Sequence, residues 1–255
     1  MTKQTLKGRI ALNCRLASLL YRYPKFRCHA ERIWACRSYG RHAMLCHDPY
    51  CLVCQGRKAY LKEQALQQQL LSLTRYEDFL PVTLTMCDCR TSQIRNTASL
   101  LTRAFKRLRR MPAVRRMCTP DFFRCVEVAR NPAREGMENV HSHGLIGLKG
   151  SHRGTSHLTA ERWSDLFNTA TEGRGRSIFV DTPIRKDAAD RLLATAAYIC
   201  KGTAEEAFEY RLQDEESLLE YLQQMEGLHR FPKGGGALNL AEPIDEYDFN
   251  FRMAA

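Results

Sequence analysis

Apolar residues follow a helical period in two segments near the start of the chain. Gln4 to Arg22 carries leucine, isoleucine and alanine side chains on one face, although Gly8 and Asn13 interrupt the pattern, and Arg57 to Thr74 carries a second leucine-rich face. Apolar residues three and four positions apart lie on the same side of a helix. The pattern therefore predicts two helices, joined by a cysteine-rich segment over 24–56 that shows little periodicity.

Apolar and polar residues alternate in several later segments, and this period of two is typical of strands. The pattern predicts strands at 79–86, 122–129, 139–148 and 177–184, and helices at 92–110, from Thr159 onward, at 187–201 and at about 204–226. The strands at 122–129 and 139–148 are expected to form a hairpin across a turn at 131–136. This order of elements describes an α+β fold, an antiparallel sheet with helices packed on one face.

Composition divides the chain into three parts. We expect a helical, cysteine-rich segment at 1–75, a sheet domain at 76–202, and an acidic C-terminal helix and tail at 203–255 that includes a turn at the three glycines 234–236. The net charge is +11, but residues 203–255 carry 12 acidic and 4 basic side chains, which leaves about +19 on residues 1–202. Such a basic body favours a polyanionic partner, above all a nucleic acid.

No apolar run approaches the roughly 20 residues that a membrane-spanning helix needs. The first residues also lack the apolar core and small-residue cleavage site of a secretory signal. We therefore expect a cytoplasmic protein with no membrane partner. In a reducing compartment, the eleven cysteines of this chain suggest metal binding more than disulfides.

The cysteine-rich segment has the spacing of a zinc site. Zinc takes four thiolate or imidazole ligands in a tetrahedron, and a two-residue spacer lets one short turn present two thiolates. The expected ligands are Cys36, Cys46, Cys51 and Cys54. Cys28 or His47 could replace one of them, and buried free cysteines are the alternative. Because a short irregular segment has little core of its own, the ion would supply much of its folding energy.

Two histidines in one strand form a candidate site for a second metal. His141 and His143 are separated by one residue, so their side chains point to the same face of the sheet. Glu127, on the strand expected to lie alongside, is the carboxylate that could complete the site. Two imidazoles and a carboxylate suit Mn²⁺ or Mg²⁺ and leave open positions for a substrate.

Tyr198 and Lys201 lie three positions apart on the helix expected at 187–201 and would share one of its faces. A tyrosine is a weak nucleophile at neutral pH unless it is helped. A divalent ion can polarise a phosphate for attack, and Lys201 could hold that phosphate or make the phenol more acidic. The combination is what covalent attack on a DNA phosphate needs.

The helix expected at 92–110 is strongly basic and is a candidate for contact with the DNA backbone. Such contacts give salt-dependent affinity without reading the base sequence. The candidate residues are Arg95, Arg103, Lys106, Arg107, Arg109 and Arg110.

Three short motifs occur in the order found in a known family. They are Phe79 to Thr85, which ends in Thr-Leu-Thr, Val140 to His143, which holds the paired histidines, and Tyr198-x-x-Lys201. Upstream, Cys46-x4-Cys51-x2-Cys54-x2-Arg57 resembles the cysteine segment of many bacterial plasmid members. The chain resembles the HUH endonuclease superfamily, specifically the rolling-circle plasmid replication initiators, over roughly residues 36–202. Arg230 with Gly235 and Gly236 resembles a short element after the nuclease.

The resemblance implies a ferredoxin-like or RRM-like sheet that nicks single-stranded DNA at a plasmid origin. Tyr198 would attack the phosphorus and stay attached to the 5′ phosphate, while His141 and His143 hold the metal. The released 3′ hydroxyl would be extended by a host polymerase, with a host helicase and origin duplex as further partners. Two positions depart from the family pattern: Ser142 replaces a bulky apolar residue, and Ala194 stands where some relatives carry a glutamate that activates water, a role for which Glu205 or Glu206 is a speculative substitute.

Two other functions fit parts of the sequence. A single-strand transposase or relaxase of the same superfamily would often place two tyrosines on the helix, where this chain offers only Tyr198. A non-catalytic, zinc-containing DNA-binding protein would explain the charge and the cysteines, but it leaves the order of the three motifs unexplained.

Overall fold

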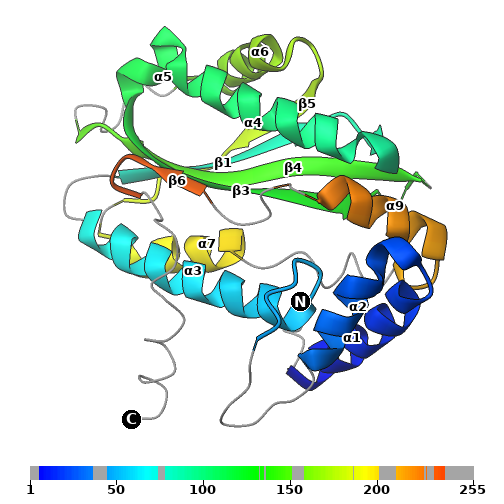
Figure 1. The fold of residues 1–255 in the computed structure, drawn as a ribbon. Helices are drawn as coiled ribbons and strands as arrows, with labels where there is room; N and C mark the ends of the chain where they lie inside the picture. Colours follow the sequence, from blue (N-terminus) through cyan, green and yellow to red (C-terminus); the bar gives the residue numbers. More distant parts are fainter. Residues whose placement is uncertain are drawn as a thin grey trace, which may run out of the picture.

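A six-stranded antiparallel sheet lies between helices in the computed structural model (Figure 1). The structure describes residues 6–36, 45–73, 78–131, 133–134, 136–150, 158–185, 187–200, 211–226, 228 and 233–238. The expected α+β class is confirmed. Within these ranges, every helix is too short or too polar to cross a membrane.

The strands run in the order β5-β1-β4-β3-β6, with β2 beside β4. Their bounds are β1 (Asp78–Met86), β2 (Cys89–Arg90), β3 (Cys118–Arg130), β4 (Met137–Leu148), β5 (Gly175–Val180) and β6 (Lys233–Gly235). The expected hairpin is present, since β3 and β4 pair antiparallel from Phe122↔Ile146 to Arg130↔Glu138. The four expected strands correspond to β1, β3, β4 and β5, although the strand expected at 177–184 ends at Val180.

Two of the three glycines expected to form a turn lie in a short strand instead. Residues 233–235 form β6, which pairs with β3 and extends the sheet at that edge. A side chain at Gly235 would collide with the ring of Phe122, and Gly236 has a φ of +67°. The glycines allow close approach to β3 and a turn directly after it, and this role carries no hydrophobic signal in the sequence.

The helices follow the expected order with two additions. Their bounds are α1 (Leu6–Tyr21), α2 (Arg27–Ala35), α3 (Leu52–Leu73), α4 (Ile94–Arg110), α5 (Pro112–Met117), α6 (Ala160–Thr171), α7 (Ala189–Cys200) and α9 (Glu215–Met225). The prediction of an irregular segment over 24–56 is wrong for α2, which buries Ala30 and Ile33 and is too short to show a clear period. The continuous helix expected at 204–226 is also wrong, because the chain is not helical at 212–214 and Asp214 caps α9.

Side-chain alternation along β4 separates two cores. Val140 and Ile146 join the core that includes α4 and α6, whereas Leu145, between them in sequence, packs with Leu66 of α3 and Leu192 of α7. The second half of β4 is buried on both sides, so a second helical layer covers the other face (Figure 1). This second face carries the candidate site.

The C-terminal helix α9 packs against the rest of the molecule. The hydroxyl of Tyr50 donates a hydrogen bond to the carbonyl of Leu222, and Arg95 donates to the last carbonyls of α9. Arg211, just before α9, forms a fully buried ion pair with Glu138 of β4. The division into three parts stays a prediction, and these contacts cross its boundaries.

Candidate active site

Glu127, His141 and His143 come together on the face of the sheet that α7 covers. Glu127 of β3 is paired directly opposite His141 of β4, so the two side chains rise side by side from the same face. The Oε2 atom of Glu127 lies 3.4 Å from His141 Nε2 and 3.5 Å from His143 Nε2. The hairpin register thus gathers the three expected ligands into one group that could hold a metal ion.

Hydrogen bonds at the Nδ1 atom of each ring, on the side away from Glu127, orient the two imidazoles. His141 Nδ1 lies 3.0 Å from Asn139 Oδ1, and His143 Nδ1 lies 3.0 Å from Thr83 Oγ1. The side-chain amide of Asn139 donates through Nδ2 to the Asp88 carboxylate. Because a carboxylate only accepts hydrogen bonds, the Asn139 nitrogen must face Asp88 and the Asn139 Oδ1 must face His141. The Nδ1–H of His141 therefore donates away from the site, which leaves its Nε2 lone pair directed toward Glu127. The hydrogen bond with Thr83 likewise turns Nδ1 of His143 away from the site and its Nε2 toward Glu127.

The donor set fits a divalent ion. His143 Nε2 is buried and has no hydrogen-bond partner among the described residues, and a buried polar atom of this kind calls for an explanation such as an ion. Cys125 is paired opposite His143, but it is not part of the group of Glu127, His141 and His143, whose donor atoms all lie within 4.8 Å of one another. Two imidazoles and a carboxylate are the donors of this group, and together they could hold a divalent ion.

Tyr198 lies over this group. Its ring sits 5.0 Å from the ring of His143, at an interplanar angle of 74°, while its side chain is 48% exposed. Leu192, Ala196 and Ile199 anchor the other side of α7 in the core. The apolar face of the helix therefore holds Tyr198 at the metal group with its ring open to solvent. Lys201, the expected cation beside it, lies outside the described residues.

A cavity of about 340 Å³ opens beside Tyr198 and His143. Ala194, the position that departs from the resembled family's pattern, lines the cavity together with Tyr198. Asp181 also lines it and is paired with Arg191, at 3.2 Å between Oδ2 and Nη2. Phe179, which is 64% exposed, contributes its aromatic side chain. The cavity thus offers an aromatic surface next to the candidate nucleophile.

The four expected zinc ligands also come together. Their sulfur atoms all lie within 4.8 Å of one another, with Cys54 Sγ 3.5 Å from Cys36 and 3.6 Å from Cys46. Four sulfurs at a zinc–sulfur distance of about 2.3 Å would stand about 3.8 Å apart in a tetrahedron. Hydrogen bonds from Cys46, Cys51 and Cys54 lower the pKa of Cys36. Cys28 is exposed and outside the group, as is His47.

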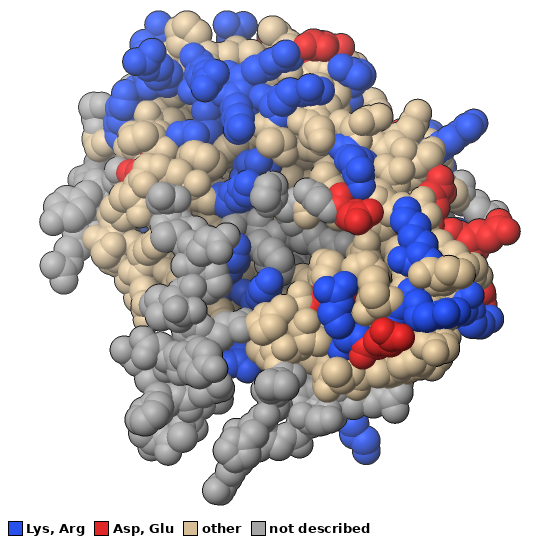
Figure 2. Space-filling view, in the orientation of Figure 1, with Lys and Arg blue, Asp and Glu red and all other residues tan. Residues whose placement is uncertain are grey.

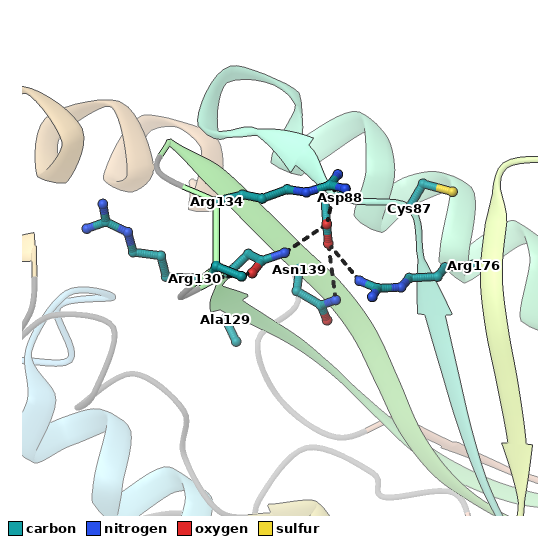
Figure 3. Close-up of a pocket in the computed structure, with 9 residues that line it drawn as sticks. Cys87, Asp88, Ala129, Arg130, Arg134, Asn139 and Arg176 are labelled. Carbon is teal, nitrogen blue, oxygen red and sulfur yellow. Dashed lines mark hydrogen bonds and ion pairs between the residues drawn. The ribbon is translucent and has the colours of Figure 1, made fainter.

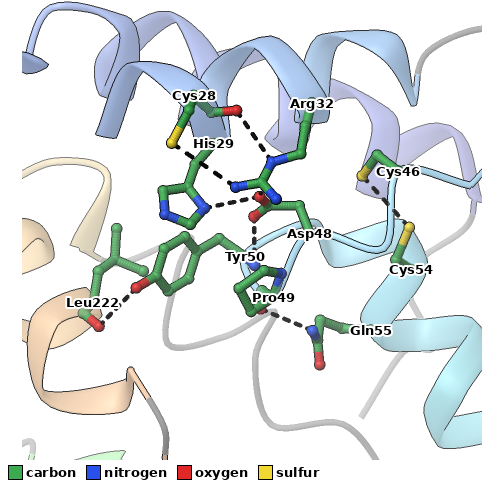
Figure 4. Close-up of polar contacts among 10 residues, drawn as sticks. All are labelled: Cys28, His29, Arg32, Cys46, Asp48, Pro49, Tyr50, Cys54, Gln55 and Leu222. Atoms are coloured by element: carbon green, nitrogen blue, oxygen red, sulfur yellow. Dashed lines mark hydrogen bonds and ion pairs between the residues drawn. The ribbon is translucent and has the colours of Figure 1, made fainter. Parts of the chain in front are cut away.

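Two polar side chains that the sequence did not single out support the cysteine group. Asn13 of α1 is buried; its Nδ2 donates to Cys51 Sγ at 3.2 Å and its Oδ1 accepts from Leu52 N. Asp48 is fully buried and binds His29 and Arg32 of α2 (Figure 4). The interruption that Asn13 makes in the apolar pattern of its helix was the available signal, because a buried amide there needs a partner.

Residues 39–248 match the family model Rep_1, described as "Replication protein". The chain belongs to this family. The match runs from before the second zinc-candidate cysteine to beyond β6 and so includes Glu127, His141, His143 and Tyr198. Neither curated proteins nor solved structures gave a match. Membership of Rep_1 supports the expected role in initiating plasmid replication.

The basic helix of this Rep_1 protein lies on the opposite face of the sheet from Tyr198. Arg95 caps α9, Arg107 pairs with Glu172, and Arg109 stacks 3.7 Å from the ring centroid of Phe122. The remaining candidates are exposed, and so are two arginines of α5; these side chains are Arg103, Lys106, Arg110, Arg115 and Arg116. Figure 2 shows basic side chains gathered over the layer that holds α4, α5 and α6. Contact of this surface with DNA stays a prediction.

The assignment of the four zinc ligands can be tested by comparing two cysteine variants. We expect one zinc ion per chain by elemental mass spectrometry, lost in Cys54→Ser and retained in the exposed control Cys28→Ser. Structural zinc contributes on the order of 10 kcal/mol of binding free energy, so Cys54→Ser should also unfold at a markedly lower temperature. Equal zinc content in both variants would refute this ligand assignment.

Proposed function

We propose that this chain is an HUH-type initiator that nicks and rejoins one DNA strand at a plasmid origin. The observation that carries the proposal is the position of Tyr198, whose ring contacts His143 at the edge of the Glu127–His141–His143 group. A nucleophile half open to solvent beside a three-donor metal group is the arrangement that phosphoryl transfer to a protein side chain requires. Family membership supports the same role.

In the proposed reaction, the Tyr198 hydroxyl attacks the scissile phosphorus. A bond forms between the phenolic oxygen and phosphorus, and the bond from phosphorus to the 3′ oxygen breaks. The phenol loses its proton and the departing 3′ oxygen gains one, so the products are a 5′-phosphotyrosine and a free 3′ hydroxyl. Reversal by an incoming 3′ hydroxyl rejoins the strand.

The chain's own residues orient this step. Asn139 and Thr83 hold the two imidazoles so that both Nε2 atoms face Glu127, and α7 places Tyr198 at the edge of the group. Mg²⁺ or Mn²⁺ bound there would polarise the phosphate and stabilise the charge on its oxygens. The free 3′ hydroxyl would serve a host polymerase, with a host helicase opening the duplex and the exposed basic surface of α4 and α5 contacting origin DNA.

The alternatives explain less. Tyr198 is the single tyrosine on α7, which favours the initiator over transposases that use two on that helix. A purely DNA-binding role gives no reason for two imidazoles and a carboxylate to converge beneath an exposed phenol.

Tyr198→Phe tests the nucleophile directly. With Mn²⁺ and overlapping single-stranded oligonucleotides that cover the encoding replicon, we expect wild-type chain to form a covalent protein–DNA adduct on denaturing gels. Tyr198→Phe removes the attacking oxygen and should form none. Tyr60→Phe is the matched control, because Tyr60 is 49% exposed on α3, and it should react like wild type. An adduct that persists in Tyr198→Phe would move the nucleophile elsewhere.

Asn139→Leu tests the metal site without removing a ligand. Removal of the acceptor for His141 Nδ1–H should weaken Mn²⁺ binding about 10- to 100-fold, the usual effect of deleting a hydrogen bond that orients a metal ligand. Electron paramagnetic resonance of free Mn²⁺ during a titration measures this. Asn96→Leu, at an exposed position on α4, should bind Mn²⁺ as wild type does. Unchanged affinity in Asn139→Leu would contradict the assigned ligand geometry.

A further inference from the structure

A second and larger cavity lies beside the metal group on the same face of the sheet. It has a volume of about 650 Å³, and its walls include Ala129 and Asn139. Ala129 and Asn139 are paired across the hairpin, and each lies two residues along its strand from the pair of Glu127 and His141. The cavity is therefore the immediate neighbour of the three metal-binding side chains.

Arginine side chains from three places in the chain line this cavity. Arg130 ends β3, Arg134 lies in the turn after it, and Arg176 comes from β5. Among the described residues that line it, Asp88 is the one acid. Three arginines against one carboxylate leave an excess of positive charge at the end of the sheet, and two of them, Arg134 and Arg176, pair with Asp88.

Asp88 acts as a buried anchor for these side chains. Only 6% of its side chain is exposed; Arg176 Nη1 lies 3.3 Å and Arg134 Nη1 3.7 Å from its oxygens. Figure 3 shows both arginines and Asn139 turned toward it. Each guanidinium has five N–H donors, and these contacts engage one nitrogen of each. Because both arginine side chains are more than half exposed, their other donors can meet an anion from solvent.

The cavity is linked to the metal group through one side chain. Asn139 donates to Asp88 from Nδ2 and accepts from His141 at Oδ1. Along β4, Asn139 and His143 stand about 13 Å apart, given a rise of about 3.3 Å per residue. A single DNA strand that ran along β4 from this cavity to the cavity beside Tyr198 would cross the group of Glu127, His141 and His143 between them.

We infer that the cavity around Asp88 binds a phosphodiester group of the nicked strand that flanks the scissile phosphate. Paired guanidinium groups recognise phosphate by bidentate hydrogen bonds, and Asp88 holds them in place before the DNA arrives. The cavity would thereby fix the register of the strand over Tyr198. This inference rests on the proposed function, since it names a second contact of the same substrate.

Cys87 provides a local probe, because it lines the cavity and is exposed. The full zinc-loaded chain is labelled briefly with a maleimide, with and without a single-stranded oligothymidylate at saturating concentration, and peptides are quantified by mass spectrometry. DNA should slow labelling at Cys87 and leave exposed Cys28 unchanged. Arg134→Gln and Arg176→Gln should remove this protection and lower the salt slope of binding by about 0.7 for each phosphate that the variant no longer neutralises.

Arg162→Gln is the matched control, because Arg162 is similarly exposed and also pairs with an aspartate, but on α6; it should keep full protection. Equal labelling of Cys87 with and without DNA would overturn the inference, as would protection that survives both arginine substitutions. If the wild-type chain forms a Tyr198-dependent adduct yet Cys87 is not protected, this inference alone fails. If Cys87 is protected but no adduct forms, the proposed nicking function fails instead.

Discussion

The candidate site depends on the pairing of Glu127 with His141 across the β3–β4 hairpin. Side chains alternate between the two faces of a sheet, so a slip of one residue would turn either partner to the opposite face. Both cores oppose that slip, since Val140 and Ile146 face α4 while Leu145 faces α7. The energy that fixes the positions of Glu127, His141 and His143 therefore comes largely from apolar packing elsewhere on the same strands.

Tyr198 is held by the same packing. Its helix contributes apolar side chains to the core that Phe79, Phe123 and Leu145 form on that face, which sets the position of the phenol above His143. Asp88 adds a polar constraint at the end of the sheet, because it orients Asn139 and through it the ring of His141. Apolar packing places Tyr198 beside His143, and the hydrogen bonds with Asn139 and Thr83 turn Nδ1 of each imidazole away from Glu127.

Much of this arrangement could be predicted from the sequence because it follows from short-range rules. The period of two placed His141 and His143 on one face, and the cysteine spacing identified the four thiols that the structure brings together. The class of the fold followed from the order of the elements. Glu127, expected on the neighbouring strand, is paired directly opposite His141.

Features that depend on distant contacts could not be predicted in this way. The strand β6 has glycines where a strand usually shows apolar residues, and α2 is too short to display its period. Asn13, Thr83, Asp88 and Asn139 act through partners far away in the sequence. The basic helix α4 gave a clear charge signal, but only the three-dimensional arrangement shows that it faces away from Tyr198.

The most direct measurement is to map the amino acid to which DNA becomes attached. After reaction with Mn²⁺ and single-stranded origin DNA, nuclease and trypsin digestion should leave a nucleotide on the peptide of residues 192–201, whose single tyrosine is Tyr198. Fragmentation should place the phosphate on that phenol. A nucleotide on any other peptide, or a phosphate attached to another side chain, would contradict the assignment of Tyr198 as the nucleophile at the Glu127–His141–His143 group.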